Sequence, residues 1–212
     1  MHKKDKKRLF FIGILLLIIS FVDIIHTIFF GPLYNLFWFS NTINVLLGLA
    51  LVIGKRLFMS AVLISSAAEI PWVIDFLGQL FLKKSLFGDV TEYMFTDFGY
   101  SSLNFYMELN HLLVIPIAIY GASKIGIHKN SYLISSTHII VLNILTYYFT
   151  LPSKNINCVY HLCLLKEDIF HVNDILYLII WTFSLCILAY LLNKIAIKFF
   201  KNHNYDFHFF FI

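Results

Sequence analysis

The stretch Ser65–Gln79, SSAAEIPWVIDFLGQ, decides how this chain must fold. It lies inside an apolar run, Leu57–Leu82, that is long enough to cross a bilayer as a helix. Its polar side chains recur every three or four residues, a spacing that places them on one helical face: Ser65, Glu69, Trp72, Asp75 and Gln79. Carboxylates are costly inside a membrane unless they face protein or water. We therefore expect this polar face to point inward, with partners supplied by other helices.

The composition indicates an integral membrane protein. Hydrophobic residues make up 59% of the 212 residues and charged residues only 13%, against roughly 45–50% and 25% in an ordinary soluble domain. The net charge of +4 comes from basic residues near the ends of apolar runs. Because these residues form no continuous basic patch, we expect no nucleic-acid partner. The expected partners are membrane lipids.

Six apolar runs predict an all-α bundle of six transmembrane helices in one domain, residues 1–212. The runs cover about 9–30, 36–54, 57–82, 104–122, 131–151 and 172–192. The first run follows the basic segment Met1–Arg8 and lacks the small-residue cleavage site of a signal peptide, so we expect it to be retained. Pro116 predicts a kink in the fourth helix.

Basic residues predict the orientation of the bundle. With the N-terminus in the cytoplasm, 12 of the 16 lysines and arginines fall on the cytoplasmic side, as the positive-inside rule requires. Both termini are then cytoplasmic, most simply in a bacterial inner membrane. The loop with Cys158 and Cys163 is extracytoplasmic in this topology, so these cysteines could form a disulfide there. The sequence leaves that pairing and the oligomeric state open.

Polar side chains from most of the predicted helices gather toward the extracytoplasmic side. Three carboxylate–histidine pairs have members three residues apart: Asp23 with His26, Glu108 with His111, and His171 with Asp174. Such a pair shares one helical face and can bind a metal or share a proton. It can also be a local hydrogen-bonded pair that eases burial. We expect Glu69 near mid-membrane, with His138 as one candidate partner.

Three sequence blocks resemble an uncharacterised family of small bacterial multi-pass membrane proteins. They are Trp72–Gln79 (WVIDFLGQ), Glu92–Phe95 (EYMF) and Asn155–Tyr160 (NINCVY), in that order along the chain. This resemblance implies a multi-pass membrane fold and no particular activity.

Two further segments are similar to the androgen-induced-protein family of six-span enzymes, which hydrolyse fatty-acid esters of hydroxy fatty acids. That family uses a threonine early in the second span and a histidine in the fourth. The similar segments here are Trp38–Thr42 (WFSNT) and His111–Pro116 (HLLVIP). The resemblance implies an ester-hydrolysing role for Thr42 and His111.

The leading hypothesis is an enzyme, a hydrolase or transferase, acting on a lipid or another membrane-dissolved ester. His111 would be the general base, Thr42 the nucleophile, and Asp75 or Glu108 the group that orients the imidazole. In a variant of this hypothesis, a divalent metal such as zinc or iron is the cofactor, with ligands drawn from Asp23, His26, Asp75, Glu108, His111 and His171.

Two alternatives stay open. One is a proton-coupled small-molecule carrier, with Glu69, Asp75 and His138 as its relay. Against it, the cytoplasmic half offers almost no polar path, and the chain has no internal repeat. The other is a non-catalytic membrane partner protein whose polar side chains only specify helix packing. The sequence does not identify the substrate.

Overall fold

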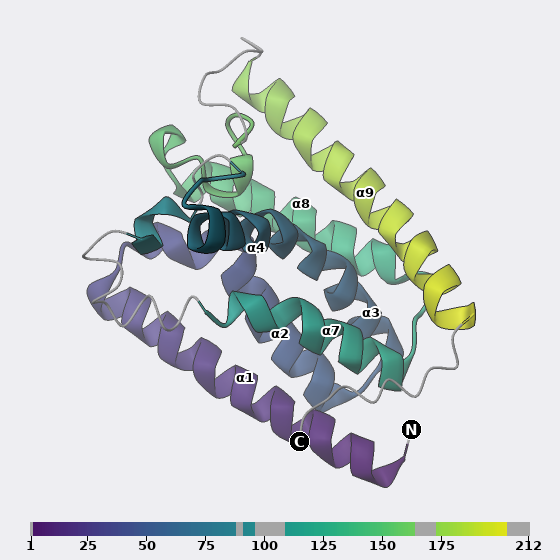
Figure 1. The fold of residues 1–212 in the computed structure, drawn as a ribbon. Coiled ribbons are helices and arrows are strands. Elements are labelled where there is room, and N and C mark those ends of the chain that lie inside the picture. Colours follow the sequence, from purple (N-terminus) through teal and green to yellow (C-terminus); the bar gives the residue numbers. More distant parts are fainter. Residues whose placement is uncertain (1, 88–90, 96–108, 164–172, 203–212) are drawn as a thin grey trace.

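The protein is all-helical in the computed structural model, which describes residues 2–87, 91–95, 109–163 and 173–202. No strand occurs in these ranges. The long elements run in the order α1 Lys3–Phe30, α2 Phe39–Ile53, α3 Arg56–Ser65, α4 Ile70–Leu77, α7 His111–Ile125, α8 Ser131–Phe149 and α9 Asp174–Asn202 (Figure 1). The predicted helical fold class is confirmed.

Four helical segments are long and apolar enough to cross a membrane: Lys3–Phe30, Arg56–Leu82, Ser131–Phe149 and Asp174–Phe200. Two shorter apolar helices, α2 and α7, accompany them. Each of the six predicted runs overlaps one of these segments within the described residues, but only four segments have the length of a membrane span. The ends are shifted, and α9 continues to Asn202, ten residues beyond the predicted end of its run.

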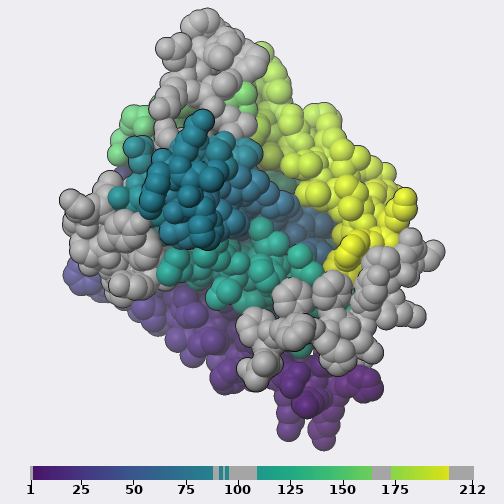
Figure 2. Space-filling model, in the orientation of Figure 1, coloured from purple at the N-terminus to yellow at the C-terminus, as the bar shows by residue number. Residues whose placement is uncertain are grey.

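The helices pack with α1 against α2, and α3 against both α7 and α8, while α9 lies along α8. In the space-filling view, α1 and α9 occupy opposite edges of the visible face, with α4 and α7 between them (Figure 2). The main core joins α1, α2, α3 and α7 through buried aliphatic side chains that include Leu9, Ile43, Leu47, Met59 and Val114.

Two glycines let α1 and α2 approach closely. A Cβ atom added to Gly13 would lie 2.8 Å from the carbonyl oxygen of Gly48, and one added to Gly48 would lie 3.0 Å from that of Gly13. Small residues at such crossings are typical of helix pairs in membranes. This contact fixes α2, and with it Thr42, on the rest of the bundle.

The sequence predicts one regular helix over the third apolar run, but the structure interrupts it twice. Its α-helical hydrogen bonding gives way to a 3₁₀ turn, η2 (Ser66–Glu69), before α4, and to a π turn at Gly78–Leu82. Pro71 lacks an N–H group, and the Ser66 hydroxyl donates to the carbonyl of Leu63 at 2.7 Å. Both features weaken the regular ladder and place Glu69 at the break.

Candidate functional site

An apolar cavity of about 790 Å³ lies between α2, α3 and α8. Its volume is within the range of roughly 300–1,000 Å³ that is usual for small-molecule sites. The lining side chains Leu49, Phe58 and Val141 are 40%, 41% and 49% exposed. The cavity therefore opens to the surroundings through an apolar rim, which suits a ligand that arrives from a hydrocarbon phase.

A threonine and a histidine meet in the wall of this cavity. Thr42 Oγ1, in the first turn of α2, lies 3.0 Å from Nε2 of His138 in α8. The ring of Phe39 packs edge-on against the His138 imidazole, with centroids 5.4 Å apart and planes at 80°. A hydroxyl and an imidazole at this distance are the two groups needed for nucleophilic catalysis by threonine.

The proton of Thr42 has two acceptors in reach. Its hydroxyl lies 2.9 Å from the carbonyl oxygen of Phe39 and 3.0 Å from His138 Nε2. When Nε2 carries the imidazole proton, it donates to Thr42, whose hydroxyl then donates to Phe39. When Nδ1 carries that proton, Nε2 accepts from Thr42, which is the arrangement that activates the hydroxyl. His138 Nδ1 is buried and has no hydrogen-bond partner among the described residues. The structure therefore favours the resting arrangement, because the activated one leaves a buried N–H group unsatisfied.

His111 belongs to a different pair. Its Nδ1 atom lies 2.8 Å from Glu69 Oε2, and the two side chains are 4% and 2% exposed. The indole of Trp72 covers the imidazole, with ring centroids 4.7 Å apart. The candidate pairing of Glu69 with His138 is therefore corrected: η2 packs against α7, whereas His138 faces α2.

Asp75 is buried and engaged by the loop that follows it. Its Oδ1 atom accepts from Ser85 Oγ, Leu86 N and Phe87 N at 2.6–2.8 Å. Its Oδ2 atom accepts from the backbone N–H and the hydroxyl of Thr91 at 2.9 and 2.7 Å. The expected role of Asp75 in orienting His111 is thus corrected: Asp75 holds residues 85–87 and Thr91 against α4, and the carboxylate beside the His111 imidazole is Glu69.

The remaining predicted residues do not complete a metal site. Among the described residues, no three His, Cys, Asp or Glu side chains are grouped so that they could hold a metal ion. Asp23 and His26 lie half-buried on α1, where the His26 ring contacts Phe30. Glu108 and His171 lie outside the described residues. The three relay candidates also separate, because Glu69, Asp75 and His138 each have a different partner.

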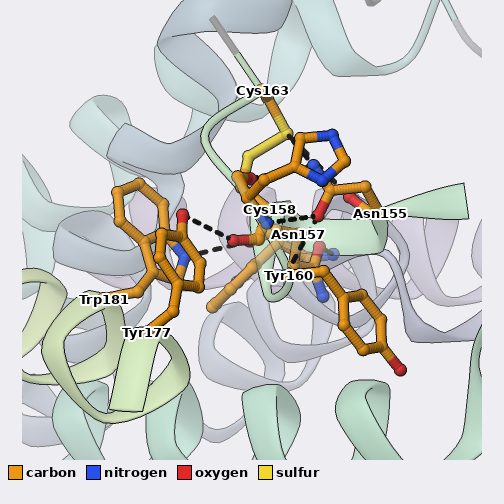
Figure 3. Close-up of a disulfide and its surroundings, with 9 residues drawn as sticks. Asn155, Asn157, Cys158, Tyr160, Cys163, Tyr177 and Trp181 are labelled. Atoms are coloured by element: carbon orange, nitrogen blue, oxygen red, sulfur yellow. Dashed lines mark hydrogen bonds between the residues drawn. A yellow bond between two sulfur atoms is a disulfide. The ribbon is translucent and has the colours of Figure 1, made fainter. Parts of the chain in front are cut away.

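Cys158 and Cys163 form a disulfide, which the sequence had left open. The bond closes a short loop after α8, drawn in Figure 3. Within it, Asn155 Oδ1 accepts from the backbone N–H groups of Tyr160 and His161 at 3.0 and 3.1 Å. Burial raises the pKa of the Tyr160 hydroxyl, which contacts the carbonyls that end α8. These contacts join residues 155–163 to one another and to the end of α8.

Asn157 is the residue of this loop that reaches the candidate site, and sequence reasoning did not single it out. Its side chain is 8% exposed and joins the start of α2 to α8. A signal was present in the sequence NIN, because asparagine is enriched in left-handed backbone conformations. Both Asn155 and Asn157 adopt them, with φ of 41° and 55°.

No family model, curated protein or solved structure matches the chain. The two family resemblances described above stay predictions. The function proposed below is therefore argued from the geometry of the Thr42–His138 pair and its cavity.

Proposed function

We propose that the protein is a membrane enzyme with six spans. It cleaves an acyl ester of a lipid, or transfers its acyl group, with Thr42 as the nucleophile. The observation that carries this proposal is the hydrogen-bonded Thr42–His138 pair in the wall of an apolar cavity with an apolar rim. The cavity would hold the hydrocarbon chain, while Thr42 and His138 face the ester. A substrate dissolved in the bilayer could enter without crossing water.

The chemistry follows from the two side chains. The Thr42 hydroxyl attacks the ester carbonyl carbon as its proton passes to His138 Nε2. His138 then returns that proton to the leaving alcohol as the carbon–oxygen bond breaks. Water releases the acyl group from Thr42 in a hydrolase, and a second alcohol releases it in a transferase.

Occupancy of the cavity is the first test. Val141→Trp should block the cavity rim and reduce both co-purified lipid and cleavage of a fluorogenic long-chain acyl ester by roughly tenfold, about 1.4 kcal/mol. Native mass spectrometry of protein in nanodiscs measures the bound lipid. The matched control is Leu133→Trp, on the same helix and similarly exposed at 53%, but outside the cavity lining. Equal effects of the two tryptophans would contradict the cavity as the binding site.

The proposal also includes cytoplasmic termini and a bacterial inner membrane. The 12 basic residues on one side of the apolar runs support this orientation. The Cys158–Cys163 disulfide adds support, since disulfides persist in extracytoplasmic compartments. The Thr42–His138 pair would then lie toward the extracytoplasmic side.

Thiol labelling in intact cells tests the orientation. In a Cys186→Ser background, which leaves the disulfide-bonded pair unreactive, Lys84→Cys should react with an impermeant maleimide from outside. Lys129→Cys should react only after the cells are opened, because it lies in the loop between α7 and α8. Both lysines are exposed. The opposite labelling pattern would reverse the proposed orientation.

A further inference from the structure

Asn157 caps α2 from a distance of more than a hundred residues along the chain. Its Oδ1 atom accepts from the backbone N–H of Phe39, the first residue of α2, at 3.0 Å. The first N–H groups of a helix have no partner within the helix and need one from outside. Trp38 occupies the N-cap position of α2, and its side chain makes no capping hydrogen bond to the described residues. Asn157 takes over that role from another segment.

The capping side chain is itself held firmly. Asn157 Nδ2 donates to the carbonyl of Phe37 at 2.7 Å and to Thr146 Oγ1 at 3.1 Å. The carbonyl of Asn157 accepts from the indole N–H of Trp181 at 3.1 Å, a contact drawn in Figure 3. The adjoining Cys158 is locked by its disulfide. Asn157 therefore ties α2, α8 and α9 to one point.

Phe39 connects this point to the Thr42–His138 pair. Its N–H group binds Asn157, its carbonyl lies 2.9 Å from the Thr42 hydroxyl, and its ring packs on the His138 imidazole. A shift of the first turn of α2 would alter both contacts of Phe39 with the pair. We infer that Asn157 is a positioning residue, which sets the distance between Thr42 and His138 through Phe39. This inference rests on the proposed function of that pair.

Two substitutions at Asn157 test the capping side chain while keeping its left-handed backbone conformation. Asn157→Gly removes every side-chain contact but tolerates the positive φ. Asn157→Asp keeps an acceptor for the N–H of Phe39 and tolerates this conformation, but it loses the donor to the Phe37 carbonyl. The matched control is Asn173→Gly, which removes the side chain that accepts from Ile175 N at the start of α9, at 3.0 Å.

Three readouts follow the effect from the cap to the pair. In Asn157→Gly, amide hydrogen exchange over residues 39–45 should be roughly five- to tenfold faster, with α7 unchanged as a control for folding. The imidazole ¹⁵N signals of His138, assigned by their loss in His138→Gln, should shift. The kcat for the long-chain ester should fall about tenfold with little change in KM, because the cavity wall is intact. Asn157→Asp should restore only part of the exchange protection, because its carboxylate caps Phe39 N–H but opposes the Phe37 carbonyl. Asn173→Gly should change none of the three readouts.

Each outcome decides one point. Unchanged exchange at residues 39–45 in Asn157→Gly would overturn the cap. Faster exchange with unaltered His138 signals would overturn the positioning role, as would equal changes in Asn173→Gly. If the wild-type protein cleaves no ester while the exchange and His138 signals respond as expected, the positioning stands and the proposed reaction fails.

Discussion

Replacing His138 by glutamine should lower ester turnover by roughly 100-fold or more, the usual contribution of a positioned general base. Glutamine can still hydrogen-bond to Thr42, but it cannot take up the proton of the hydroxyl. Thr42→Val should have at least as large an effect, because it removes the nucleophile and keeps the branched shape. Thr42→Ser should retain much of the activity. The measurement is kcat for a long-chain acyl ester with protein purified in nanodiscs.

The neighbour Thr137 provides the control for this pair. It also lines the cavity, but its hydroxyl donates to the carbonyl of Leu133 at 2.9 Å. Thr137→Val should therefore leave turnover near the wild-type value. All variants should be present in the membrane at similar abundance. Wild-type turnover in both Thr42→Val and His138→Gln would refute catalysis by this pair.

The broad fold follows from the sequence because apolar length is a one-dimensional property. Each apolar run corresponds to a helical segment, and the polar face of the third run is buried as expected, with Glu69 and Asp75 2% and 0% exposed. The spacing in Ser65–Gln79 determines which side chains need partners, but it does not say which helix provides them.

The partners were harder to predict, because they depend on how the helices rotate and slide against one another. Glu69 pairs with His111, and Thr42 with His138, whereas the sequence had joined Thr42 to His111. The close approach at Gly13 and Gly48 is one contact that sets this register. It is decided by space between backbones, which hydropathy patterns do not report.

The loops after α4 and α8 make more hydrogen bonds to the helices than their sequences had led us to expect. The blocks WVIDFLGQ and NINCVY contain Asp75 and Asn157, the residues that fix the loops after α4 and α8 to the bundle. The resemblance of these blocks to a family of membrane proteins stays a prediction, but Asp75 and Asn157 each have several hydrogen-bond partners in the structure. Hydroxyl residues soon after a buried aspartate, such as Ser85 and Thr91, were the available signal for the first of these loops.

Replacing Asp75 should give a large loss of stability. Its carboxylate accepts five hydrogen bonds, three of them from backbone N–H groups. The two Thr91 donors are fully buried, whereas Leu86 is 47% exposed. An unsatisfied buried donor costs about 1–3 kcal/mol, so loss of the acceptor for the two buried Thr91 donors in Asp75→Ala should reduce the free energy of unfolding by about 2–4 kcal/mol. We expect a strongly lowered thermal midpoint in detergent and low abundance in cells.

Asp75→Asn should lie between the wild type and Asp75→Ala, since an amide has one oxygen for two groups of donors. Its oxygen can serve Ser85, Leu86 and Phe87, while its NH₂ group can donate to the Thr91 hydroxyl but opposes the Thr91 N–H. Glu92→Gln is the matched control, because Glu92 is an exposed carboxylate in the same region and its loss should change the midpoint little. Turnover per folded molecule should be nearly normal in Asp75→Asn. A large loss of turnover with an unchanged midpoint would instead return Asp75 to the chemistry of the site.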